Sequence, residues 1–322
     1  MKPKSALRWL WFLLALPIAL PAQSLEEGMA YYSKGRFGDA KKVFESILQK
    51  DDNNAEAHYR LGMILLNRSF RNEDEAVDHM ERAVELAPQN ADYHYGLGAA
   101  YGSKAQNAGV LKQAFLAPKV KSSFQRAVEL DPRHVEAHIG LAQYYQRAPG
   151  IMGGDMEKAW KEADVIIQLD EVRGRSFKAG LYLADKKIAE ADRELNTLTT
   201  NRAEDWRAWR AAGSIYLRNH RSDDAIVMFQ KYVALRPDTS DSHARLAQAY
   251  LQKKEADPAM IAAKKAVALE KDSFNAISFL AYAQELKGQK KEARENYQRL
   301  LSMDLNPDQK KNVEQKIKEL QN

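Results

Sequence analysis

Hydrophobic positions along the chain repeat in a way that predicts pairs of short helices. In residues 206–239, counted from Trp206 as position 1, small or apolar side chains fall at positions 4, 7, 8 and 11, and again at 20, 24 and 27. Each set lies on one face of an α-helix, because residues three and four apart share a helix face. Two amphipathic helices that pack face to face are therefore predicted, built on Trp209, Ala212, Gly213, Tyr216, Ala225, Phe229 and Tyr232.

Small residues at the predicted helix crossing indicate close packing. Gly213 and Ala225 are expected to face each other, which would let the two helix axes approach closely. Pro237, at position 32, cannot continue the second helix and closes the unit. This spacing resembles the 34-residue tetratricopeptide repeat (TPR). The resemblance implies an all-α, right-handed superhelical solenoid whose first helices line a concave groove.

The same pattern extends over most of the chain. Aligning the small residue of each first helix with the alanine of each second helix predicts a TPR array over residues 23–306. About eight helix pairs are expected, with units starting near residues 21, 55, 91, 135, 172, 206, 240 and 274. A helix over 307–322 is expected to cover the open face of the last unit.

Two units depart from the regular length. The third carries an insert at 102–119, whose apolar residues at helical spacing predict an extra or extended helix. The fourth has a long glycine-rich turn at 148–155, expected to need positive φ angles. Together the insert LKQAFLAPK and the turn YYQRAPGIMGGD resemble a subgroup of exported bacterial TPR proteins.

The amino terminus has the pattern of a secretory leader. Basic residues precede an apolar run at 9–20, and Ala22 precedes Gln23, which predicts a signal peptide over 1–22. Pro17 interrupts the run, which is shorter than the roughly 18 apolar residues of a spanning helix, so no stable membrane span is expected after cleavage. The chain has no cysteine, which suits an oxidising compartment. A periplasmic or secreted bacterial protein is predicted.

Charge and motifs narrow the function classes. The chain has 49 Lys and Arg against 44 Asp and Glu, a net charge of +5, and Lys2, Lys4 and Arg8 lie within the predicted leader. The remainder is nearly balanced, so nucleic-acid binding is not expected. The glycine-rich turn lacks the lysine and threonine of a phosphate-binding loop, and no cofactor is predicted.

The histidines favour a packing role over catalysis. Four of them occupy position 4 of their units, where the family has a large aromatic residue: His58, His94, His138 and His243. Equivalent positions in neighbouring units lie on the order of 10 Å apart, too far to share a metal ion. An enzyme is therefore not predicted. The alternative from that class is a metal-dependent hydrolase that uses the glycine-rich turn with His134, His138 and Asp155.

Binding in the family uses positions 2, 5, 9, 12 and 13 of each first helix. Here these positions give the groove candidates Tyr59, Met63, Tyr95, Gln143, Arg147, Arg173, Arg207, Arg210, Ser214, Arg218 and Gln248. No unit supplies the lysine and asparagine pair of the carboxylate clamp found in chaperone-binding relatives, so that class of partner is not expected.

Four of the candidates are arginines of units five and six: Arg173, Arg207, Arg210 and Arg218. If they face one part of the groove, they suit an acidic segment or a carboxylate. The alternative is a solvated face neutralised by Glu204 and Asp205. Tyr59, Met63 and Tyr95 would contact an apolar part of the same partner.

The predicted function is a protein-interaction scaffold or adaptor of the bacterial cell envelope that binds a partner peptide or protein in the groove. By analogy, the alternative is a subunit of a polysaccharide-secretion or cytochrome-maturation assembly. The sequence does not define an oligomeric state or the identity of the partner.

Overall fold

The computed structural model describes residues 24–303 and 305–321 and confirms the all-helical solenoid. The predicted signal peptide lies outside these residues. The first eight helices are α1 (Leu25–Ser33), α2 (Phe37–Lys50), α3 (Ala55–Leu65), α4 (Glu73–Leu86), α5 (Ala91–Gln106), α6 (Val110–Leu130), α7 (Val135–Arg147) and α8 (Met156–Leu169). A short 3-10 helix, η1 (Gly150–Met152), lies between α7 and α8. The others are α9 (Glu171–Ala184), α10 (Ile188–Asn201), α11 (Trp206–Arg218), α12 (Ser222–Leu235), α13 (Ser240–Gln252), α14 (Ala256–Leu269), α15 (Phe274–Leu286), α16 (Lys290–Leu301) and α17 (Pro307–Glu319).

Polar residues define where the helices begin. The side chains of Asn54, Asn90 and Asp205 accept hydrogen bonds from backbone N–H groups in the first turns of α3, α5 and α11. These groups have no partner inside a helix, so each cap stabilises its helix by about 1 kcal/mol. Asp170 ends α8 and caps α9 as a single connecting residue.

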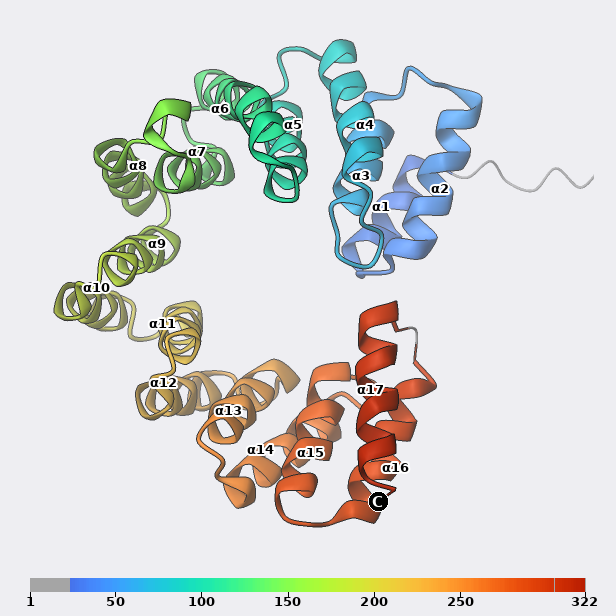
Figure 1. The fold of residues 1–322 in the computed structure, drawn as a ribbon, viewed down its shortest axis with the longest axis vertical. Coiled ribbons are helices and arrows are strands. Elements are labelled where there is room, and N and C mark those ends of the chain that lie inside the picture. Colours follow the sequence, from blue (N-terminus) through green and yellow to red (C-terminus); the bar gives the residue numbers. More distant parts are fainter. Residues whose placement is uncertain (1–23, 304, 322) are drawn as a thin grey trace, which may run out of the picture.

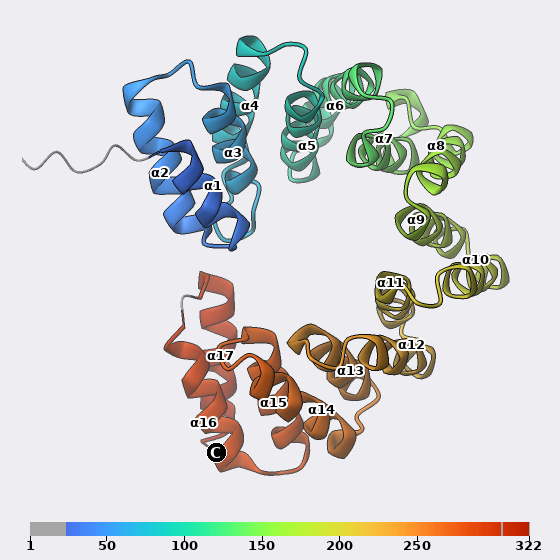
Figure 2. The ribbon, with the colours of Figure 1, turned by 180° about the vertical axis from the view of Figure 1, so that it is seen from behind.

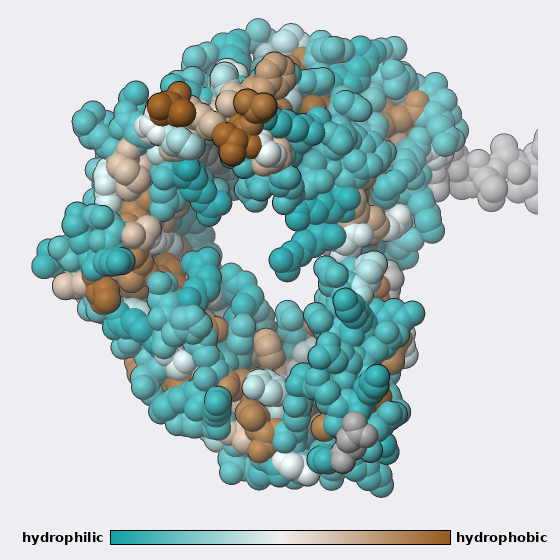
Figure 3. Space-filling model, in the orientation of Figure 1, coloured by the Kyte–Doolittle hydropathy of each residue, from teal (hydrophilic) through white to brown (hydrophobic). Residues whose placement is uncertain are grey.

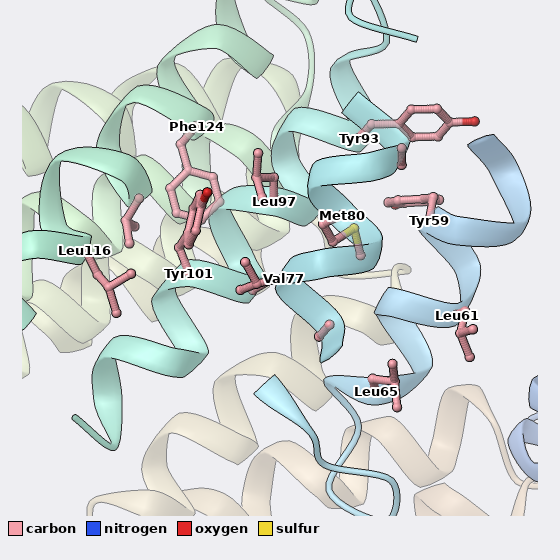
Figure 4. Packing of buried hydrophobic residues seen from close by; sticks show 14 of the residues in the cluster. Tyr59, Leu61, Leu65, Val77, Met80, Tyr93, Leu97, Tyr101, Leu116 and Phe124 are labelled. Carbon is pink, nitrogen blue, oxygen red and sulfur yellow. The ribbon is translucent and has the colours of Figure 1, made fainter. Parts of the chain in front are cut away.

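The helix pairs follow one another around a curved solenoid. Seen along its shortest axis, the solenoid forms an almost closed ring, with α5, α7, α9 and α11 on the inner side and α6, α8, α10 and α12 on the outer side (Figures 1 and 2). The largest apolar cluster runs from α2 to α8 and a separate one from α9 to α13. In the first of these, Tyr59, Met80 and Leu97 connect neighbouring pairs (Figure 4).

In four of the helix pairs, a glycine of the first helix accommodates a large side chain of the second. A Cβ atom added to Gly213 would lie 2.6 Å from Phe229 Cε1. The residue packed against Gly213 is therefore Phe229, and the expected facing partner, Ala225, lies one turn earlier in the same buried cluster. The same arrangement occurs in three earlier pairs: Gly28 with Phe44, Gly62 with Met80, and Gly98 with Phe124.

The insert of the third unit lengthens both of its helices. Whereas α11 and α12 have 13 and 14 residues, α5 has 16 and α6 has 21. The expectation of an extended helix therefore describes the insert better than that of an extra one. Pro118 lies inside α6 and has no backbone N–H for the preceding turn, so its helix lacks one internal hydrogen bond there.

Charged groups link the two helices of the fifth pair, α9 and α10. Arg175 bonds to Glu171 at 2.9 Å and to Glu194 at 2.7 Å, and both carboxylates are largely buried. Hydrogen bonds from Arg175, Asn201 and Arg202 lower the pKa of Glu171 to about 2. Charged hydrogen bonds therefore add to the apolar packing between α9 and α10.

Helix α17 follows the α15–α16 pair. Asn306 and Gln309 form a capping box at the start of α17, and Pro307 occupies its first position. Val313, Ile317 and Leu320 share an apolar cluster with side chains of α15 and α16. None of the helices described here is long and apolar enough to cross a membrane.

Candidate binding groove

The third and fourth pairs enclose a cleft on the inner side of the solenoid. It has a volume of about 480 Å³ and lies between α5, α6, α7 and η1. Its walls are mainly apolar. The insert contributes Gly102, Ser103, Ala105, Gln106, Gln113 and Ala117, and the glycine-rich turn contributes Ala148, Pro149 and Met152.

Gly140 and the Phe124 ring line the floor of this cleft. Cβ atoms added to Gly98 and Gly140 would lie 2.7 Å and 2.6 Å from the Phe124 ring, which therefore occupies space that only glycine leaves free. The Tyr95 ring lies 6.1 Å from the Phe124 ring and 5.3 Å from that of His134. Such offset aromatic contacts hold the floor rigid and present ring surface to the cleft.

Glycines also shape the wall formed by η1. Gly153 has φ +91°, and a Cβ on Gly154 would lie 1.7 Å from the carbonyl oxygen of Ala148. The turn therefore needs glycine at both positions. The Tyr144 hydroxyl donates a hydrogen bond to the Met152 carbonyl, which fixes η1 against α7.

A second cleft continues the first along the inner surface. It has a volume of about 580 Å³ and lies between α7, α9 and α11. Ile139, Gln143, Arg147 and Arg173 line both clefts, so the two form one groove. In the space-filling view, the inner surface surrounds an open centre (Figure 3).

Three arginines line this groove, namely Arg147, Arg173 and Arg218. Glu136 is the acidic residue among the lining side chains. Arg173 Nη1 pairs with Glu136 Oε1 at 2.5 Å. Although burial would raise the pKa of Glu136, the hydrogen bond from Arg173 holds it below its usual value. Among the described residues, Arg147 and Arg218 have no ion pair or side-chain hydrogen bond.

Apolar side chains are also exposed beside the cleft mouth. Val110, Leu111 and Phe115 lie at the start of α6 and Ile151 lies in η1, with Leu111 89% and Ile151 95% exposed. Figure 3 shows hydrophobic groups gathered over these elements. Exposed apolar clusters on an otherwise polar surface are typical of interaction sites.

The predicted groove residues divide into three groups. Five of them line the groove: Tyr95, Gln143, Arg147, Arg173 and Arg218. Gln248 lines a separate, smaller cleft. The remainder are engaged within the chain: Tyr59, Met63, Arg207, Arg210 and Ser214.

The four arginines predicted to face one part of the groove do not act as a group, because Arg207 and Arg210 form ion pairs with aspartates of this chain. The Arg207 side chain makes three hydrogen bonds to Asp205, and Arg210 Nε bonds to Asp241 at 2.9 Å. Local neutralisation by Asp205, the alternative reading of this surface, therefore applies to Arg207. Arg173 and Arg218 share the second cleft. Tyr59 is buried against Tyr93, with 5.0 Å between the rings, so it is a core residue.

Position 4 of the units has a recurrent structural role. The Nε2 atoms of four histidines contact the carbonyl oxygen six residues earlier, at 2.9 to 3.0 Å: His58, His94, His138 and His243. In the regular sixth unit, Trp209 Nε1 donates the same bond to Ala203 at 2.7 Å. In these five units, the side chain at position 4 therefore ties the first helix to the connection before it.

The residues of the hydrolase alternative are each held by structural bonds. His134 Nδ1 accepts from the Ala137 N–H and caps α7, while Nε2 lies 3.1 Å from Asp92. His138 Nδ1 bonds to Glu162 Oε2 at 2.6 Å. Asp155 caps α8. Across the described ranges, no group of three or more metal-binding side chains is found.

Sequence reasoning missed the walls of the cleft. Gln113, Ala117, Phe124 and Met152 line it, yet the family positions assign binding only to first helices. The available signal was the loss of the 34-residue period, because both walls come from the two segments where the spacing changes.

A solenoid of helix pairs with a groove along its inner side is the architecture of a repeat-based binding protein. A family model described as tetratricopeptide repeat matches residues 25–91, 178–238 and 210–276. These ranges together span more than half of the chain, which therefore belongs to the tetratricopeptide repeat family. They leave out 92–177, the segment that contains nearly all of α5 to α8.

Similar proteins support the same fold. Tetratricopeptide repeat protein 37 of Xenopus laevis is 29% identical over 67% of this chain, which spans 13% of that protein's length. Yeast Tom70 matches 92% of this chain and 61% of its own, with a TM-score of 0.66 and 15% identity. A TPR protein of Parabacteroides merdae matches 92% of this chain and 97% of its own, with a TM-score of 0.51 and 14% identity.

Proposed function

We propose that this protein is an interaction scaffold of the bacterial cell envelope that binds a segment of a partner protein in the groove over α5, α7, α9 and α11. TPR proteins generally act as protein-interaction scaffolds. The observation that carries the proposal is the continuity of the two clefts through Gln143, Arg147 and Arg173. A groove that crosses several first helices suits an extended chain better than a compact metabolite.

The size and chemistry of the groove support this function. The volume of each cleft lies within the roughly 300–1,000 Å³ range of ligand-binding pockets. Aromatic and aliphatic walls supply contact area, and a few polar groups point from α7 into the groove.

The envelope location rests on the amino-terminal pattern. A basic start, an apolar run at 9–20 and Ala22 before Gln23 are typical of a leader that is removed on export. Fractionation of the source cell, with amino-terminal sequencing of the protein, tests this part. Export should yield a chain that starts near Gln23, whereas a cytoplasmic protein that keeps Met1 would contradict it.

Site-specific photo-crosslinking in the source cell tests the binding function. A photoreactive amino acid at Gln143, which is exposed in both clefts, is compared with one at Lys161, which is exposed on the outer helix α8. A partner crosslinked at 143 and absent at 161 is the expected result. Equal capture at the two positions would show that the groove is not the binding surface.

A further inference from the structure

We propose that the groove selects a segment in which a large apolar side chain lies a few residues from acidic side chains. This specificity rests on the proposed function. The apolar side chain enters the cleft between α5, α6 and α7, and the acidic side chains pair with Arg147 and Arg218. The partner is therefore defined by chemistry, as an extended acidic peptide with an apolar anchor.

The first cleft is built for an apolar anchor. Phe124 and Tyr95 form its floor, and Ala99, Ala117 and Val120 contribute small or aliphatic walls. The small side chains leave a volume of about 480 Å³ that a leucine, phenylalanine or tryptophan side chain fits inside. Burying such a side chain stabilises a complex by roughly 1.5–3 kcal/mol.

The charge of the second cleft selects acidic neighbours. Three arginines and one glutamate line the groove, and the glutamate is already paired with Arg173. Arg147 and Arg218 thus remain as cations without a partner in the described part of the chain. Their guanidinium groups bind carboxylates in a bidentate manner.

A neutral polar group connects the two subsites. Gln143 lines both clefts and has no hydrogen-bond partner within the described ranges. Its amide offers a donor and an acceptor to the backbone of a segment that passes from the apolar cleft to the arginines. This placement orders the subsites along α7.

Selection from a displayed library of random peptides about twelve residues long reveals the preference directly. Peptides bound by the purified protein should be enriched in a large apolar residue with Asp or Glu a few positions away. Enrichment of basic peptides, or of apolar residues without acids, would overturn the proposed specificity. An enriched peptide carrying a fluorophore then serves as the probe.

Titration of this probe against variants assigns the subsites. Arg147→Glu and Arg218→Glu change exposed residues, so folding should be unaffected, and each should raise the Kd by about tenfold or more. Ala99→Trp should have a similar effect by filling the apolar cleft. Arg207→Glu is the matched control, because Arg207 pairs with Asp205 and does not line either cleft. Equal effects of Arg147→Glu and Arg207→Glu would overturn the assignment.

The two proposals fail in different ways. If position 143 captures a partner in cells but the library shows no acidic preference, groove binding stands and the specificity is wrong. If an acidic apolar peptide binds but remains unaffected by Ala99→Trp, Arg147→Glu and Arg218→Glu, the site lies elsewhere and both proposals are wrong.

Discussion

The pairs α11–α12 and α5–α6 follow the same repeat rule with different outcomes. In α11–α12, Phe229 fills the space above Gly213 and is 0% exposed. In α5–α6, Phe124 has the same relation to Gly98 but is 6% exposed, and it lies at the floor of a cleft. The longer helices and the glycine-rich turn next to α5–α6 add walls around a residue that elsewhere belongs to the core.

The comparison distinguishes the residues that form the packing contacts of the solenoid from the segments that form the proposed binding groove. A regular unit buries its apolar faces on its own partner helix and its neighbours. An irregular unit keeps the packing contact and adds segments that no neighbouring repeat covers. Apolar residues such as Leu111 and Ile151 then stay exposed.

The largest expected effect is on the regular pair. Ala225 is fully buried, so Ala225→Arg should overpack the helix contact and bury a charge, lowering the free energy of unfolding by about 3 kcal/mol or more. Val227→Arg, in the same helix at a side chain 51% exposed, is the control and should change stability by less than about 1 kcal/mol. Denaturant titration compares the two, and equal losses would show that the helix register is wrong.

A smaller effect distinguishes the two aromatic residues directly. Gly213→Ala should destabilise the protein by about 2 kcal/mol, because Phe229 is enclosed and cannot move away from the new methyl group. Gly140→Ala should cost less, because Phe124 can shift into the open cleft, but it should weaken binding of the peptide probe. Thermal unfolding and probe titration measure the two effects.

Alanine favours a helix more than glycine does, so the effect of each Gly→Ala substitution includes a gain in helix propensity that needs a separate control. Gly180 lies inside α9 with no atom within 4 Å of an added Cβ. Gly180→Ala should therefore stabilise the protein by up to about 1 kcal/mol. If Gly213→Ala were also stabilising, the close contact with Phe229 would not exist in solution.

The sequence predicted the architecture well because each regular unit contains its own packing information. Trp209, Gly213 and Phe229 fall on the faces that the helical period assigns to them. The groove was predicted less completely. Gln143 and Arg147 follow from family positions, but Gln113 and Met152 line the cleft only because two separate irregular segments meet in space. The periodic pattern of the repeats does not predict that these two segments lie close together.

The smallest expected effect is a dependence of the unfolding free energy on pH, which arises from the histidine at position 4 of the fourth unit, His138. Trp209 does not titrate, whereas His138 in the irregular region donates from Nε2 to Pro132 and faces Glu162 through Nδ1. The bond to Glu162 raises the pKa of His138 above its usual value. The stabilisation is therefore complete below about pH 6.5 and is lost as the pH rises through the folded-state pKa.

This dependence can be measured by comparing the protein with Glu162→Gln. The difference in unfolding free energy should be largest near pH 5.5 and should shrink toward roughly pH 8. His79 should show the opposite trend, because burial and the neighbouring His58 lower its pKa. Its stabilising contribution is present above about pH 6.5 and is lost as the pH falls. A pH-independent difference for Glu162→Gln would exclude the charged pair.

The central claim is that the partner binds in the groove that begins at the irregular pairs and continues to α11, and not along the regular pairs beyond it. Gln143 and Gln248 are the same residue type at position 9 of an irregular and a regular unit. The direct test places a photoreactive amino acid at each and compares partner adducts in the source cell. Predominant capture at position 143 is predicted, and equal or greater capture at position 248 would contradict the account.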